Sequence, residues 1–115
     1  MSDPYREGLD RLSRIRGVRG ALIVDGAAGV PVIADVSPDV PVPALAALAA
    51  SLYRRTERSA RDAGLGQVRA LQLVAEHGHI LMAQGKDVMV VALAEPTAQL
   101  GLVRLEVRKL AEAVR

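Results

Sequence analysis

The sequence predicts a three-layer α/β (α+β) domain in which helices cover both faces of a five-stranded, mainly antiparallel sheet. Apolar residues recur with helical or strand periodicity in eight segments, in the order α-β-β-α-β-β-β-α. The segment 88–94 is apolar on both sides of its pleat, which is typical of a central strand covered by helices on both faces. We therefore expect the terminal helices together on one face and the long middle helix on the other.

The first elements are a short helix and two strands. Apolar residues at helical spacing predict a helix from Tyr5 to Arg16. Strands are predicted at 21–24 and 30–34, joined by the glycine-marked turn 25–29. Because Pro31 cannot donate a ladder hydrogen bond, the second strand is expected at an edge of the sheet.

A long helix is predicted from residue 44 to residue 63, after a proline-rich connection. One stripe at helical spacing is expected to pack on the sheet of its own subunit: Leu45, Leu48, Leu52, Thr56, Ser59 and Ala63. Ala47 and Ala50 are expected on the outer face, where small side chains allow a second backbone to approach closely. The second half of the outer face is rich in arginine.

The last part of the chain predicts three strands and a helix. The strand-like segments 68–75, 80–83 and 88–94 are joined by short turns and form an antiparallel meander. A final helix is predicted over 95–115. Its apolar stripe consists of Leu100, Val103, Val107, Leu110 and Val114.

Length and composition restrict the class of protein. The 115 residues are expected to form a single domain, 1–115. Because cysteine is absent, disulfides, thiolate metal sites and cysteine nucleophiles are excluded, and we expect a soluble protein in the reducing cytoplasm. The N-terminus lacks a signal-peptide pattern, and the longest strongly apolar run, 88–94, is too short to span a membrane.

The charge pattern argues against a nucleic-acid partner. Fifteen Lys and Arg stand against thirteen Asp and Glu, so the formal net charge is only +2. Binding to single-stranded nucleic acid usually involves aromatic stacking, and the chain has two Tyr and no Phe or Trp. We therefore expect neither a nucleic-acid nor a membrane partner.

No motif predicts a catalytic, cofactor or metal site. The segment 78–87 resembles a phosphate loop, but six residues separate its glycines and Asp87 replaces the required Ser or Thr. The segment 64–69 begins like a dinucleotide fingerprint, yet a strand follows where a helix is needed. His77 and His79 are interpreted as a solvated turn, because a metal site there needs further ligands.

Three further segments carry a resemblance to a known family. They are 17–21 before the first strand, the turn 25–29 before Val30-Pro31-Val32, and 100–104 at the start of the last helix. With the order of elements, they make the chain resemble the Roadblock / dynein light chain family of small-GTPase regulators and motor light chains, over nearly its whole length. The resemblance implies a roadblock (profilin-like) architecture and no catalytic residues.

The resemblance also implies a homodimer or heterodimer in which the long helices pack together and the third strands pair across a two-fold axis. The segment 68–75 fits this role, because it lacks proline and glycine and carries only one charge, Arg69. The expected dimer contacts are Ala47, Ala50, Ser51, Arg69, Leu71 and Leu73.

In bacterial relatives the dimer resembles a docking platform for a Ras-like GTPase whose hydrolysis it stimulates. The residues expected to dock the GTPase are Arg54, Glu57, Arg58 and Arg61, although such a run is more often a solvated helix face. The leading hypothesis is a non-enzymatic regulatory dimer that modulates GTP hydrolysis or nucleotide state. The alternatives are a structural dimerising adaptor and a small-molecule sensor domain with a pocket between sheet and helix.

Overall fold

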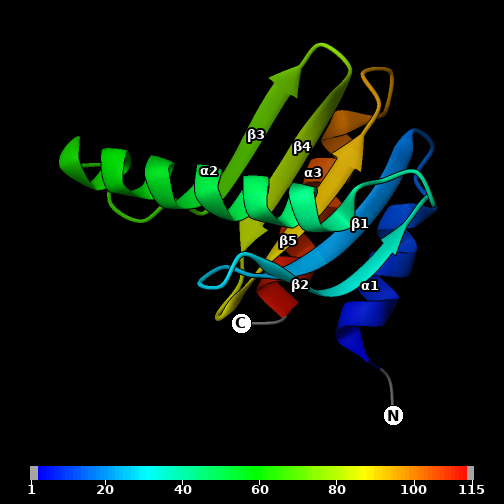
Figure 1. The fold of residues 1–115 in the computed structure, drawn as a ribbon, viewed down its shortest axis with the longest axis horizontal. Coiled ribbons are helices and arrows are strands. Elements are labelled where there is room, and N and C mark those ends of the chain that lie inside the picture. Colours follow the sequence, from blue (N-terminus) through cyan, green and yellow to red (C-terminus); the bar gives the residue numbers. More distant parts are fainter. Residues whose placement is uncertain (1–2, 114–115) are drawn as a thin grey trace.

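The computed structural model describes residues 3–113 and contains the predicted elements in the predicted order (Figure 1). Five antiparallel strands form one sheet in the order β2-β1-β5-β4-β3. The predicted fold class is therefore confirmed. The elements are α1 (Pro4–Ser13), β1 (Val18–Asp25), β2 (Val30–Val36), α2 (Val42–Asp62), β3 (Ala70–Ala75), β4 (Gly78–Gln84), β5 (Val88–Ala94) and α3 (Leu100–Ala113).

The sheet has β2 and β3 as its edges and β5 at its centre. Pro31 lies in the edge strand β2, as predicted, beside an irregularity in the pairing of β1 with β2. There Ile23 pairs with Ile33 and Val24 with Pro31, which leaves Val32 as an extra residue. An edge position tolerates proline because one side of the strand has no neighbouring strand to receive its missing hydrogen bond.

Two hydrophobic cores lie on opposite faces of the sheet. Helices α1 and α3 cover one face, and α2 covers the other (Figure 1). Successive residues of β5 serve the two cores in turn: Val90 and Ala92 face α1 and α3, whereas Met89 and Val91 face α2. This double burial is the reason why the β5 segment is apolar on both sides of its pleat.

Two helix boundaries differ from the prediction, one at the end of α1 and one at the start of α3, and both lie next to the paired strands β1 and β5. Helix α1 ends at Ser13 rather than Arg16, and Gly17 adopts a φ of 90°. The backbone N–H of Glu95 donates to the carbonyl of Gly17 at 2.7 Å, so residues before Leu100 form a turn instead of the first part of α3. The predicted helix residues Val114 and Arg115 lie outside the described residues.

Within residues 3–113, none of the helices has both the length and the apolar character that crossing a bilayer requires.

Two helix glycines, one at the contact between α1 and α3 and one away from any contact, predict opposite effects of substitution by alanine. In α1, a Cβ at Gly8 would lie 2.4 Å from Cδ1 of the buried Leu110, so Gly8→Ala should overpack this contact and destabilise the fold by about 1–3 kcal/mol. In α3, a Cβ at Gly101 meets no atom within 4 Å, so Gly101→Ala should stabilise by up to about 1 kcal/mol. Urea unfolding measures both, and a neutral Gly8→Ala would contradict the close approach.

Candidate functional site

The C-terminal half of α2 extends beyond the sheet. The first half lies across the sheet, and the second half projects past the edge formed by β3 (Figure 1). The connection from α2 to β3 returns along this projecting half, which we call the α2 overhang (residues 53–62). Its position is supported by the hydroxyl of Tyr53, which donates to the backbone carbonyl of Val68 at 3.0 Å.

Residues of both signs meet on the α2 overhang. Together with Tyr53 and Asp62, the four predicted docking residues Arg54, Glu57, Arg58 and Arg61 line one surface hollow of about 330 Å³. Arg61 pairs with Glu57 at 2.8 Å, and Arg54 donates to the carbonyl of Gly26 at 3.1 Å. Arg58 is exposed and pairs with no carboxylate of the described residues.

Burial and the neighbouring Glu57 carboxylate raise the pKa of Tyr53 to about 12. Desolvation is the largest cause, because it disfavours the charged phenolate. The second Glu57 carboxylate oxygen is buried and accepts no hydrogen bond from a described residue. The hollow is therefore lined by three arginines together with the partly buried carboxylate of Glu57.

An apolar groove lies on the same face of the sheet, between the first half of α2 and the β3–β4 hairpin. Its volume is about 500 Å³, and leucines from three elements line it: Leu48 of α2, Leu73 of β3 and Leu93 of β5. Leu48 is 47% exposed, which is unusual for a leucine on a helix that packs against a sheet. The groove is thus an apolar surface with no described residue covering it.

The edge strand β3 presents unpaired backbone groups. The N–H of Gln84 donates to the carbonyl of Arg69, so Arg69 and Gln84 form a hydrogen-bonded pair of the β3–β4 ladder. Hydrogen-bonded and non-hydrogen-bonded pairs alternate in an antiparallel ladder. It follows that Ala70, Gln72 and Val74 direct their N–H and C=O groups away from β4, toward the open edge.

Comparison with known families decides the identity of this fold. Residues 5–94 match the sequence profile of the Roadblock/LC7 domain. The chain belongs to the Roadblock/LC7 domain family. The resemblance found in the sequence is therefore confirmed. A relative in the same size range is the uncharacterized protein MJ1340 of Methanocaldococcus jannaschii, which is 26% identical over 104 residues, covering 90% of each chain.

Solved structures of MglB are similar to this Roadblock domain over almost its whole length. MglB in a tetrameric arrangement matches with a TM-score of 0.85 and 26% identity, covering 99% of this chain and 89% of that one. The gliding protein MglB of Thermus thermophilus matches with a TM-score of 0.83 and 24% identity, covering 99% and 90%. Myxococcus xanthus MglB has a TM-score of 0.80 and 21% identity, covering 92% and 87%. The last two similarities support the fold alone.

Most residues predicted for a dimer contact lie at surfaces of the Roadblock domain. Ala47 and Arg69 are exposed, and Ser51, Leu71 and Leu73 are half-buried. Leu71 and Leu73 pack partly against the core beneath α2. These residues lie on or next to α2 and β3, the two elements that meet at the open edge.

Ala50 and Leu48 exchange the roles that we predicted for them. Ala50 is fully buried within its own subunit, together with Ala46 and Ala49, so its predicted position on the outer face is wrong. Leu48 was expected on the sheet but is about half exposed, in the groove. The physical reason is that the small alanine side chains let the helix lie close to the sheet and share its buried face with Leu45, which leaves Leu48 at the side of the helix.

The histidine prediction is only partly correct. His77 is highly exposed in the turn, but His79 lies in β4 and is 91% buried, since its exposed fraction is 9%. The sequence reasoning also missed the apolar groove. Its signal was the almost unbroken apolar character of the first half of α2, which offers more apolar surface than one sheet face can cover.

The raised pKa of Tyr53 predicts a loss of stability at high pH. Because the pKa rises from 10.0 to about 12 on folding, the neutral phenol stabilises the native state fully below pH 10, and this contribution disappears as the pH approaches 12. Urea unfolding of the native protein and of Tyr53→Phe across this range should show the larger decline in the native protein. In a Tyr5→Phe background, where Tyr53 is the remaining tyrosine, phenolate absorbance gives the Tyr53 titration, and a midpoint near 10 would contradict the burial argument.

Proposed function

We propose that this Roadblock domain is a non-enzymatic regulatory protein that forms a homodimer, binds a Ras-like small GTPase and modulates its GTP hydrolysis or its nucleotide state. The observation that carries the proposal is the combination of an open β3 edge with a helix that overhangs it, in a chain of the Roadblock/LC7 family. The family resemblance connects this architecture to small GTPases in bacterial relatives.

The open edge of β3 supports an isologous dimer. Antiparallel pairing of two β3 strands across a two-fold axis satisfies the outward groups of both chains. The register in which every outward backbone group forms a hydrogen bond places Gln72 opposite Gln72 of the second chain and Ala70 opposite Val74. This register forms about six hydrogen bonds, the most that three outward residues per strand allow.

The same two-fold axis brings the α2 overhang of each chain over the other chain. The overhang projects past β3 (Figure 1). In the proposed dimer it therefore extends over the partner's sheet and reaches the end at which the apolar groove of the partner opens. The two α2 helices then run antiparallel beside each other. In this arrangement Leu48 and Leu73 become buried, which accounts for an apolar groove of about 500 Å³ on a free subunit.

The arginines of the α2 overhang are the proposed docking surface for the GTPase. Arg54, Arg58 and Arg61 offer cations that attract an acidic surface patch. An arginine finger is less favoured, because Arg54 and Arg61 are already engaged within the chain. Modulation is better explained by ordering of the GTPase switch loops through the contact surface.

The test of function is GTP turnover by a Ras-like GTPase of the same organism, measured with and without the protein. A changed rate of hydrolysis or exchange supports the proposal. Stable binding with no change in either rate would favour the alternative, a structural dimerising adaptor. Absence of binding in both nucleotide states would refute the GTPase partner altogether.

The β3 register predicts a specific cross-link. Because the chain has no cysteine, Gln72→Cys introduces a single thiol, and the proposed register brings it directly opposite its own copy. The Cα atoms of a hydrogen-bonded pair are about 5.5 Å apart, within the range of a disulfide. Mild oxidation should therefore yield a covalent dimer on non-reducing gels.

Two matched variants test the register against general proximity. Ala70→Cys and Val74→Cys lie on the same strand, but each faces the other position and should cross-link poorly alone. The double variant Ala70→Cys/Val74→Cys should cross-link well. If one of the single variants forms the dimer faster than Gln72→Cys, the register is wrong, and a monomer in sedimentation would remove the β3 dimer.

The docking surface predicts a charge-reversal phenotype. Arg54→Glu with Arg58→Glu should weaken binding of the GTPase by about tenfold or more, because two attractive charges become repulsive. The sedimentation behaviour of the dimer should not change. Calorimetry or anisotropy with the labelled GTPase measures the affinity.

Arg104→Glu with Arg108→Glu provides the matched control for this variant. These arginines have the same spacing on a helix but lie on the opposite face of the sheet. They should leave GTPase binding unaltered. Equal weakening by both double variants would mean that only net charge matters, and the assignment to α2 would fail.

A further inference from the structure

The face of the sheet that carries α1 and α3 leaves one strand without a helix. Helix α1 packs on β1 and β2, and α3 packs on β4 and β5. Strands are spaced by about 4.8 Å and packed helices by about 10 Å, so one helix covers two strands. Five strands and two helices therefore leave β3 uncovered, and Figure 1 shows no helix behind it.

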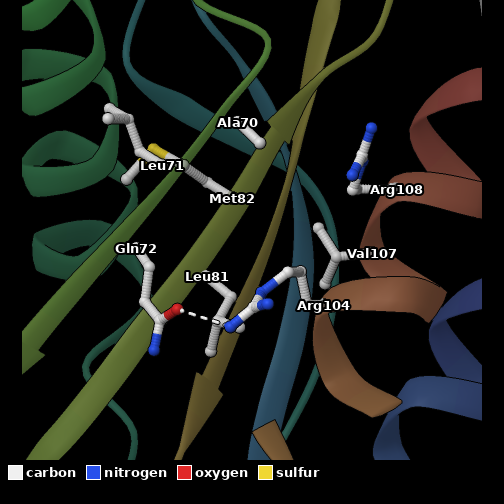
Figure 2. A pocket seen from close by; sticks show the side chains of 8 residues that line it. All are labelled: Ala70, Leu71, Gln72, Leu81, Met82, Arg104, Val107 and Arg108. Carbon is white, nitrogen blue, oxygen red and sulfur yellow. Dashed lines mark hydrogen bonds between the residues drawn. The ribbon is translucent and has the colours of Figure 1, made fainter. Parts of the chain in front are cut away.

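The uncovered surface of β3 is largely apolar. Ala70, Gln72 and Val74 are exposed, and Val74 has an exposed fraction of 66%. Beside them, a cavity of about 220 Å³ opens between β3, β4 and α3, with Leu81 and Val107 lining it (Figure 2). An apolar side chain from another molecule has room to enter this cavity.

The wall of the cavity is cationic. Arg104 and Arg108 lie one turn apart on α3, beside the cavity (Figure 2). Arg104 donates to the Gln72 side chain at 3.3 Å, and neither arginine pairs with a carboxylate of residues 3–113. The acidic residue Glu112 lines an adjacent hollow together with Arg108.

On the other flank of α3, the basic side chains pair with a carboxylate of the same chain. Glu106 lies 3.6 Å from Arg11 of α1 and 3.8 Å from Lys109. The free cations of α3 therefore belong to the flank beside β3. This asymmetry points to an external acidic group on that side.

The dimer of the proposed function doubles this surface. If two β3 strands pair, two uncovered strands lie side by side and expose a strip about 10 Å wide, which is the width of one packed helix. The strip, here called the β3 trough, has Ala70, Gln72 and Val74 of both chains as its floor. Arg104 and Arg108 of each chain form its walls.

We propose that the β3 trough binds one acidic amphipathic helix of a third protein per dimer, on the face opposite to the GTPase surface. The apolar side of that helix packs on the floor, and its carboxylates on both flanks pair with the arginines of the two walls. The inference rests on the proposed dimer but not on the GTPase. It makes the dimer a connector between two partners on opposite faces.

The test uses a synthetic helical peptide that has a leucine and alanine stripe on one side and glutamates on both flanks. A second peptide has lysine at every glutamate position. Fluorescence anisotropy with the full chain should show saturable binding of the glutamate peptide, at one peptide per two chains. Arg104→Glu with Arg108→Glu should weaken this binding about tenfold or more, and higher salt should weaken it in the native protein.

Arg54→Glu with Arg58→Glu is the control, because it makes the same charge change on α2 and should leave the affinity for the peptide unaltered. Equal loss with both double variants, equal binding of the lysine peptide, one peptide per chain or no saturable binding would each overturn the proposal. Failure of the dimer is detected separately by the Gln72→Cys cross-link. Failure of the GTPase partner is detected by GTP turnover, so failures of the dimer, of the GTPase partner and of the β3 trough can be distinguished from one another.

Discussion

The arrangement depends on the contact between three alanines of α2 and the sheet. Ala46, Ala49 and Ala50 are fully buried there, and their small side chains bring the helix backbone close to the strands. This contact lies in the first half of the helix, so the second half extends past β3 (Figure 1). It also turns Leu48 sideways into the groove. The overhang, the groove and the exposed leucine thus share one cause.

The second constraint is the odd number of strands. Each helix covers about two strands, so the face with α1 and α3 cannot cover all five. The open strand is β3, whose outward backbone groups at the edge have no strand partner within residues 3–113 and whose side chains Ala70, Gln72 and Val74 are exposed on one face. A free sheet edge is usually protected by charge, proline or a bulge. Here β3 itself is apolar apart from Gln72, which fits an edge that another chain covers.

Prediction from the sequence succeeded where one residue pattern has one structural solution. Pro31 placed β2 at an edge, and the doubly apolar segment 88–94 identified the central strand. It failed where the pattern allowed two solutions. The first half of α2 is apolar almost all round, so periodicity did not distinguish the leucine side from the alanine side. The four docking residues were predicted from a charge run, and the structure brings them to one hollow.

By itself, the sequence determined the number, kind and order of the elements, because local periodicity and turn residues depend on near neighbours along the chain. It also determined that the protein has no cysteine chemistry. Only the tertiary structure decided which side of α2 is buried, that α2 overhangs the sheet, and that Arg104 and Arg108 line a cavity beside β3. These features depend on where a helix crosses a sheet and on strand order, which bring together residues that are distant in the sequence.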